Sequence, residues 1–434
     1  MDGGQGPSNA RNRQSTGLRP QMSNSFKTGT KGVLTMAVGT VRSGPDYFDE
    51  AFGVSIAKLL GMLRRSFSMD MAFIGKFEHG TRTMVFVESD NNADLSSEGF
   101  CFSHPQSQTY CRKIADGELP SIIPDARSNA ITRAMDVTNE LSIGAYLGVP
   151  IYLSDGEIYG TLCCLKHSSD PSLETRDPSL LAFVADVIAD RIEFHRHRQR
   201  HDNQIRSRIE GLSSSQELTM HFQPIWSITG AAICGYEALA RFNTEPYRSP
   251  DIWFSEAEQV GLGDFLETLA IDLALTQLPK IPESCFLSIN ASPAAILSGA
   301  VGNLLNRKDA HRIVLEVTEH SQILDYPEFR DSVQSIRKMG ARLAIDDAGS
   351  GYASLQHVLE LDADIIKLDL NLIRNIHCDR KKQALAAALV SYAQRVRAQV
   401  VAEGVETQEE FDVLKELGVD KVQGYYIGKP AELA

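Results

Sequence analysis

The sequence predicts an α/β protein in which a (β/α)8 barrel follows a smaller α+β domain and a disordered N-terminal tail. Three observations predict this order. The first 44 residues contain few large apolar side chains, residues 45–198 alternate helical and strand-like patterns, and short apolar runs alternate with helical stretches from Leu218 onward. The 434 residues are enough for two or three domains, at about 150 residues each.

Composition excludes several classes of protein. The formal net charge of −13 argues against a protein that coats nucleic acid, because that task needs a basic surface. The longest apolar runs, such as residues 34–41, are far shorter than the ~20 residues that span a bilayer. The seven cysteines are scattered and form no CxxC pair, which is typical of a reduced, cytoplasmic compartment. We therefore expect neither a nucleic acid polymer nor a membrane as partner.

Residues 1–44 are rich in Gly, Ser, Asn and Gln, and carry six basic residues against one acidic residue, Asp2. Such a segment cannot bury enough apolar surface to offset the entropy lost on ordering. We expect a disordered tail. A targeting segment is the alternative, because the start is rich in Arg and Ser.

The next segment has the pattern of an α+β domain. Apolar residues recur at a spacing of three to four over residues 48–63, which predicts an amphipathic helix. Four strand-like runs follow, at residues 71–77, 83–87, 145–152 and 158–165. Asp177 and Pro178 are typical of the start of a helix, with Asp as N-cap and Pro in the first helical position.

That helix is expected to continue beyond the domain. One seven-residue register is shared by Leu181, Ile188, His195, Asp202 and Ile209. The register allows either a two-stranded signalling coil or a solvated linker helix, and the basic run at 195–201 interrupts the apolar seam. The expected boundaries are therefore a tail at 1–44, a first domain at 45–198, a helical linker at 199–214 and a barrel domain at 215–434.

Eight apolar runs in the second half each end at a polar side chain. These side chains are Gln223, Glu237, Asn290, Glu316, Asp346, Lys367, Glu403 and Gln423. In a (β/α)8, or TIM-like, barrel the carboxyl ends of the strands meet at the face that holds the active site. A single acid after a strand is usually a helix cap or a surface residue. Eight polar residues in this position predict a common site.

The residue types in this predicted site favour metal-dependent chemistry. Oxygen donors come from Glu237, Asn290, Glu316, Asp346, Asp347 and Glu403, with no His or Cys among them. Mg²⁺ and Mn²⁺ prefer such donors, whereas Zn²⁺ usually binds imidazole or thiolate. Consecutive Asp346 and Asp347 could serve two ions, which together stabilise the attacking and leaving oxygens of a phosphoester displacement. The sequence therefore predicts hydrolysis of a phosphodiester.

Residues 215–434 resemble the EAL-domain cyclic di-GMP phosphodiesterases. The resemblance rests on Glu237-Ala238-Leu239-Ala240-Arg241, and on the motifs at 288–292, 316–319, 346–352, 366–369, 402–407 and 423–425. Residues 46–198 are similar to a GAF sensory domain, most clearly at 110–113, 124–126 and 143–150. The first resemblance implies hydrolysis of cyclic di-GMP to linear pGpG with two divalent ions, Mg²⁺ or Mn²⁺. The second implies regulation by a sensor domain whose ligand the sequence does not identify.

The EAL resemblance also implies roles for individual residues. The metal ligands would be Glu237, Asn290, Glu316, Asp346, Asp347 and Glu403. Lys367 would orient or polarise the attacking water, with a proton affinity depressed by the metals. Gln423 would support the water network, and Arg241 and Gln223 would contact the substrate. Glu319 would anchor the loop that follows Asp347, and the family pattern implies a homodimer.

Two departures and two alternatives accompany this resemblance. Ala348 stands where the family has Phe, and Ser350 where it has Thr or Ala, which affects loop rigidity and dimer coupling rather than metal ligands. A barrel that binds cyclic di-GMP without turnover is the main alternative, and a metal-dependent hydrolase of another phosphodiester is the next. In the sensor domain, Cys163 and Cys164 are expected to be buried packing residues, and Cys111, beside two basic residues, is the better redox candidate.

Overall fold

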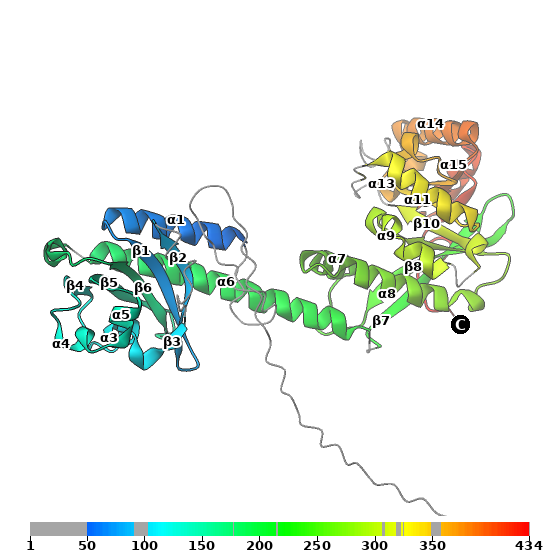
Figure 1. The fold of residues 1–434 in the computed structure, drawn as a ribbon. Coiled ribbons are helices and arrows are strands. Elements are labelled where there is room, and N and C mark those ends of the chain that lie inside the picture. The colour runs from blue at the N-terminus through cyan, green and yellow to red at the C-terminus, as the bar shows by residue number, and fades with distance from the viewer. Residues whose placement is uncertain are drawn as a thin grey trace, which may run out of the picture. The chain divides into compact units, whose positions relative to one another are not determined.

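The computed structural model describes residues 50–90, 103–176, 178–213, 216–305, 309–317, 323, 325–348 and 357–433. The chain divides into two compact units, Met1–Arg200 and His201–Ala434 (Figure 1). The predicted tail at 1–44 lies outside the described residues, and so does Asp177. Among the helices that are described, none is both long enough and apolar enough to cross a membrane.

The first unit contains a six-stranded antiparallel sheet with the strand order β3-β2-β1-β6-β5-β4. Its strands are β1 (Met71–Glu78), β2 (Thr81–Ser89), β3 (Ser103–Pro105), β4 (Ile122–Ile123), β5 (Ala145–Tyr152) and β6 (Ile158–Lys166). The four strands predicted from the sequence are confirmed as β1, β2, β5 and β6. The turn between β1 and β2 is made by His79 and Gly80, which both have positive φ angles.

Helices cover both faces of this sheet (Figure 1). On one face, α1 (Glu50–Ser66) and the first part of α6 (Ser179–Gly211) pack in one apolar cluster with β6 residues such as Cys164. On the other face, α3 (Tyr110–Ala115) and α5 (Asp136–Glu140) pack in a second cluster, which includes Cys163. The short helices η1 (Gln106–Gln108), α4 (Ala130–Arg133) and η2 (Pro171–Thr175) complete this unit.

The apolar seam of α6 packs inside the chain. Leu181 and Ile188 are buried in the core of the first unit. Ile205 and Ile209 are buried in the second unit with Phe242 and other residues of that unit's core. The seam at these four positions is therefore not the contact surface of a two-stranded coil, because the side chains pack in the chain's own cores, whereas residues 197–204 between them are exposed or half-buried, as expected for a linker helix. A buried helix face has the same apolar period as a coil seam.

The second unit contains a closed eight-stranded barrel with the order β10-β11-β12-β13-β14-β7-β8-β9. Its strands are β7 (Leu218–Ser227), β8 (Ala232–Phe242), β9 (Phe286–Asn290), β10 (Ile313–Val317), β11 (Arg342–Ala348), β12 (Ile365–Leu368), β13 (Gln399–Ala402) and β14 (Lys421–Gln423). The helices between them are α7 (Pro250–Gln259), α8 (Gly263–Thr276), η3 (Leu278–Lys280), α9 (Pro293–Leu297), α10 (Ala300–Leu305), η4 (Ala310–Arg312), α11 (Tyr326–Lys338), α13 (Leu370–Ile373), η5 (Ile376–Cys378), α14 (Arg380–Val396) and α15 (Gln408–Glu416). All eight predicted strands are confirmed.

The barrel differs from the expected all-parallel form at its first strand. β7 runs antiparallel to both of its neighbours, β8 and β14. Only residues 228–231 connect β7 to β8, which is too short for a crossover helix. Gly230 donates its N–H to Ser227 Oγ in this turn, and Ala231 has a φ of 47°. Gln223 and Glu237 were both expected at strand ends, but they lie opposite each other in the middle of β7 and β8.

An apolar layer closes the barrel interior beneath the predicted site. It consists of Ile225, Phe286, Val314, Ala344, Ile365 and Val401. Several of these precede a predicted site residue by two positions on the same strand, such as Val314 before Glu316 and Ala344 before Asp346. Side chains two apart on a strand point the same way. The polar residues therefore form the next layer towards the barrel mouth.

The buried end of α6 provides a stability test. We expect Ile209→Ala to lower the free energy of unfolding of the second unit by about 2–5 kcal/mol, because it leaves a cavity in the cluster around Trp253. Urea unfolding followed by tryptophan fluorescence reports this unit alone, since the chain's two tryptophans are Trp226 and Trp253. The control is Gln204→Ala, at an exposed position of the same helix. Equal midpoints for the two variants would contradict the packing described.

Candidate active site

Strands that are distant in sequence bring most of the predicted site residues to one end of the barrel. Glu237 lies on β8, Glu316 on β10, Asp346 on β11 and Lys367 on β12. Glu403 follows the last residue of β13. All five project from positions next to the apolar layer, which is why they face the interior.

Lys367 lies at the centre of four carboxylates. Its Nζ is 2.5 Å from Glu403 Oε1, 2.8 Å from Glu316 Oε2, 3.1 Å from Asp346 Oδ1 and 3.7 Å from Glu237 Oε2. The lysine side chain is only 1% exposed. We call these five residues the Lys367 cluster. One ammonium group cannot neutralise four carboxylates, so the cluster retains an excess of negative charge unless it binds protons or cations.

The pKa values in the cluster reflect this imbalance. Burial raises the pKa of Glu316 to about 8, against the attraction of Lys367, and Glu237 and Asp346 raise it further. Burial likewise raises the pKa of Glu403 well above its ordinary value. Burial alone would lower the pKa of Lys367, but the surrounding carboxylates raise it well above its ordinary value. The depressed proton affinity expected for Lys367 depends on bound metal, and the carboxylates by themselves act in the opposite direction.

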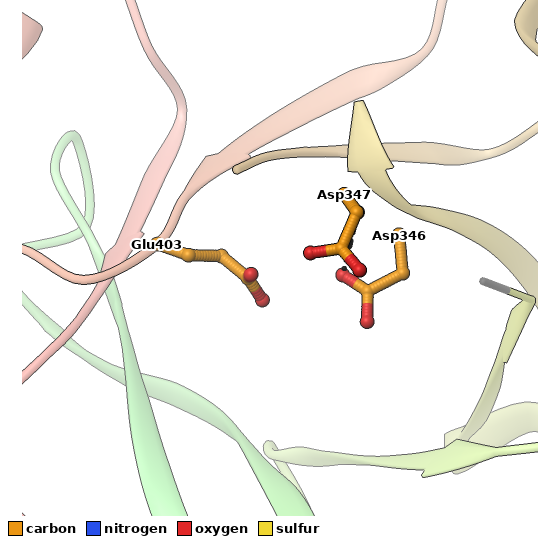
Figure 2. Close-up of side chains that lie close together, drawn as sticks. All are labelled: Asp346, Asp347 and Glu403. Carbon is orange, nitrogen blue, oxygen red and sulfur yellow. Dashed lines mark hydrogen bonds between the residues drawn. The ribbon is translucent and has the colours of Figure 1, made fainter. Parts of the chain in front are cut away.

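Asp346, Asp347 and Glu403 form a potential metal site. Each offers a carboxylate oxygen within 4.8 Å of the others, and Figure 2 shows the three side chains converging from two segments of the barrel. Asp347 has a φ of 57°, in the left-handed region, and its N–H donates to Asp346 Oδ1 at 3.0 Å. This conformation interrupts the strand alternation that would point consecutive side chains to opposite faces. An all-carboxylate donor set of this kind fits Mg²⁺ or Mn²⁺.

Two glutamines, on the neighbouring strands β14 and β7, form a hydrogen-bonded chain with Glu237. Gln423 Nε2 donates to Glu237 Oε2 at 2.5 Å and to Gln223 Oε1 at 3.0 Å. Gln223 Nε2 in turn donates to the Gly428 carbonyl oxygen at 3.1 Å. Gln423 Oε1 is buried, and within the described part of the chain it has no hydrogen-bond partner. It is therefore an acceptor available to a water or ligand donor in the mouth.

Ser288 is a site residue that the sequence reasoning did not single out. Its hydroxyl donates to Glu316 Oε1 at 2.5 Å and both side chains are buried, so it fixes the orientation of this carboxylate. The sequence did contain a signal. Ser288 precedes Asn290 by two residues on β9 and therefore shares its face of the strand.

The other residues predicted to act at the site lie in different environments, and some of them are outside the described residues. Asn290 ends β9 beside Glu316 in the strand register and is exposed. Arg241, near the end of β8, is half-buried and its Nη1 donates to the Ala240 carbonyl oxygen at 2.8 Å. Glu319 lies outside the described residues, as do residues 349–356 with Ser350. Ala348 is described, and it is fully buried at the end of β11.

Comparison with known families agrees with both resemblances. Residues 203–430 match the family described as EAL domain, and residues 55–193 match the family described as GAF domain. The first match covers more than half of the chain and includes every residue of the Lys367 cluster.

Curated relatives share parts of this chain. An "Uncharacterized signaling protein" of Caulobacter vibrioides is 28% identical over 334 residues, which cover 74% of this chain and 40% of that protein. "Cyclic di-GMP phosphodiesterase PdeF" of Escherichia coli is 31% identical, over 49% of this chain and 30% of that protein. "Cyclic di-GMP phosphodiesterase NbdA" of Pseudomonas aeruginosa is 30% identical, over 50% of this chain and 29% of that protein. The chain thus spans less than half the length of each of these relatives.

Removing the ammonium group of Lys367 tests the electrostatics of the Lys367 cluster. We expect Lys367→Met to lower the free energy of unfolding by about 3–5 kcal/mol in metal-free buffer, because it leaves buried carboxylates without their counter-charge. Urea unfolding in the presence of a chelator, followed by tryptophan fluorescence, measures this change.

Lys421→Met is the matched control. Lys421 is also buried in the barrel, but its Nζ donates to the neutral Gln399 side chain, and burial lowers its pKa. Its loss is expected to cost about 1 kcal/mol, as for one neutral hydrogen bond. A Lys367→Met protein as stable as the Lys421→Met protein would contradict the role of Lys367 as counter-ion.

Proposed function

Because the chain belongs to the EAL domain family, we propose that it hydrolyses cyclic di-GMP to linear pGpG with the help of two divalent metal ions, Mg²⁺ or Mn²⁺. The observation that carries this proposal is the convergence of four carboxylates on Lys367, with Asp347 beside them, at the mouth of the barrel. The names of PdeF and NbdA as cyclic di-GMP phosphodiesterases support the choice of substrate.

In this proposal the metal ligands are Glu237, Asn290, Glu316, Asp346, Asp347 and Glu403. Bound ions would supply positive charge to the substrate phosphate and to the oxygens that develop charge during displacement. The cluster has the negative potential needed to attract them, and the donor oxygens of Asp346, Asp347 and Glu403 are close enough to share an ion.

The other residues act on water and substrate. Lys367 holds the carboxylates in position. With metal bound, it would orient or polarise the attacking water. Gln423 fixes Glu237 and offers its free acceptor to that water, while Gln223 supports Gln423 and contacts the substrate. Arg241 binds a substrate phosphate through its forked donors. Glu319 anchors the loop after Asp347.

Regulation and assembly complete the proposal. The GAF domain at residues 55–193 would control the activity of the barrel, and the enzyme would act as a cytoplasmic homodimer in signal transduction by this bacterial second messenger. The assembly can be checked by light scattering.

Turnover separates hydrolysis from simple binding. Purified protein incubated with cyclic di-GMP and Mg²⁺ or Mn²⁺ should produce pGpG, detected by chromatography. Glu237→Ala and Asp346→Ala should each lower the rate by at least about 100-fold, as expected when one electrostatic stabiliser is lost. Glu416→Ala, at an exposed position of α15, is the control and should leave the rate unchanged. Tight binding by the wild type without any product would instead indicate a receptor.

The raised pKa values predict how metal binding depends on pH. Glu316, whose pKa is about 8, and Glu403, whose pKa is raised well above its ordinary value, retain protons at neutral pH without metal. A metal ion binds the deprotonated carboxylates, so binding should release protons, and affinity should rise with pH until about 8.

Calorimetric titration with Mn²⁺ in buffers of different ionisation enthalpy measures both quantities. Glu316→Gln, which cannot titrate, should release fewer protons than the wild type. An affinity that is constant or falls across this pH range would refute the prediction.

A further inference from the structure

Two cysteines from different elements of the GAF domain are in contact in its core. Cys111 lies on α3 and Cys163 on the inner strand β6, and their Sγ atoms are 3.8 Å apart. The two side chains are buried, with exposed fractions of 1% and 0%. A disulfide has an S–S distance of about 2.05 Å, so the pair is a dithiol in contact. Sequence reasoning assigned separate roles to these two cysteines, and the structure places them in contact.

The surroundings of this pair are polar and charged. Tyr146 Oη lies 3.3 Å from Cys111 Sγ, and the buried side chain of Arg82 lies next to the same thiol. The side chains of Arg82 and Cys111 both cover the backbone of Gly75. A Cβ added to Gly75 would be 2.9 Å from Arg82 Cδ and 3.5 Å from Cys111 Sγ. Cysteines that only fill an apolar core do not need a buried guanidinium beside them.

A chain of polar groups leads from Arg82 towards the surface. Arg82 Nη2 donates to His104 Nδ1 at 3.1 Å, which leaves the proton of His104 on Nε2. His104 Nε2 then donates to Glu140 Oε2 at 3.0 Å, and the Glu140 side chain is 54% exposed. The positive charge near Cys111 is thus held in place by two further side chains.

The two thiols are not equivalent. Burial raises the pKa of both, but a hydrogen bond with Cys163 and the charge of Arg82 reverse this effect for Cys111 and lower its pKa. Burial and the neighbouring Cys111 raise the pKa of Cys163 well above its ordinary value. The charge of Arg82 therefore favours the thiolate at Cys111 over the thiolate at Cys163, and thiolates are the reactive form of cysteine.

We propose that Cys111 and Cys163 form a reversible dithiol–disulfide site that reacts with hydroperoxides. The Cys111 thiolate attacks the peroxide oxygen of H₂O₂, the O–O bond breaks, and the products are Cys111 sulfenic acid and hydroxide, which takes up a proton to become water. Cys163 then attacks the Cys111 sulfur, and a second water leaves as the disulfide forms. In total two thiols lose two electrons and two protons to one peroxide. Burial favours small oxidants such as H₂O₂.

Cys164 is an internal control provided by the strand itself. It follows Cys163 on β6 but faces the opposite core cluster, packed with α1 and α6. Burial raises its pKa to about 12, with no partner that lowers it. Cys164 should therefore be inert under conditions that oxidise Cys111 and Cys163.

The test uses the full chain, fully reduced and then treated with H₂O₂. Alkylation under denaturing conditions should show the loss of two of the seven thiols, restored by dithiothreitol. Peptide mapping should find Cys111 cross-linked to the peptide that carries Cys163 and Cys164. Cys164→Ser should keep the cross-link, and Cys163→Ser should lose it and instead accumulate Cys111 sulfenic acid, trapped with dimedone.

Several outcomes would overturn the proposal. They are a wild-type chain that keeps all seven thiols, a cross-link that survives Cys163→Ser, and sulfenic acid at Cys163 rather than at Cys111. Circular dichroism checks that each variant is folded. The wild-type mapping does not depend on any variant, so a misfolded variant leaves the test intact. None of these measurements depends on phosphodiesterase activity.

Discussion

The carboxylates at the barrel mouth depend on the buried ammonium group of Lys367. Lys367 holds carboxylates from β8, β10, β11 and the residue after β13 within 4.0 Å, in a layer that rests on apolar side chains. Without this charge, the acids would repel one another in a site that excludes most water. The same excess of negative charge that makes the cluster costly for the protein makes it suitable for divalent cations. Stability and proposed chemistry therefore have a common origin.

Neighbouring hydrogen bonds hold the carboxylates of the Lys367 cluster in position. Ser288 fixes one oxygen of Glu316, and Gln423 fixes one oxygen of Glu237. Glu316 contacts Lys367 Nζ through its other oxygen, and Glu237 contacts it through the same Oε2 that Gln423 holds. A carboxylate held from two directions keeps its orientation when protons or cations exchange around it. The supporting residues are Ser288 on β9, Gln423 on β14 and Gln223 on β7, which accepts a hydrogen bond from Gln423. Nearly the whole barrel therefore contributes to the geometry.

The sequence predicted the eight strands because each contains a short apolar run followed by a polar residue, but it placed Gln223 and Glu237 at strand ends, whereas both lie in the middle of longer strands. It did not predict the antiparallel direction of β7, although the four-residue turn around Gly230 was a sufficient signal. It also misassigned the seam of α6, since an apolar heptad has the same spacing whether it faces a partner helix or the helix's own domain core. The contact between Cys111 and Cys163 joins residues 52 apart, and no local pattern encodes such a pairing.

Two pairs of consecutive residues show why local sequence does not fix side-chain direction. Cys163 and Cys164 lie on a regular strand, so alternation sends them to different cores and gives them opposite chemical environments. Asp346 and Asp347 have the same arrangement in sequence, but the left-handed backbone at Asp347 and the register shift after Ile345 bring both carboxylates to one site. Asp tolerates this conformation better than most residues. The backbone of one residue thus decides whether neighbours act separately or together.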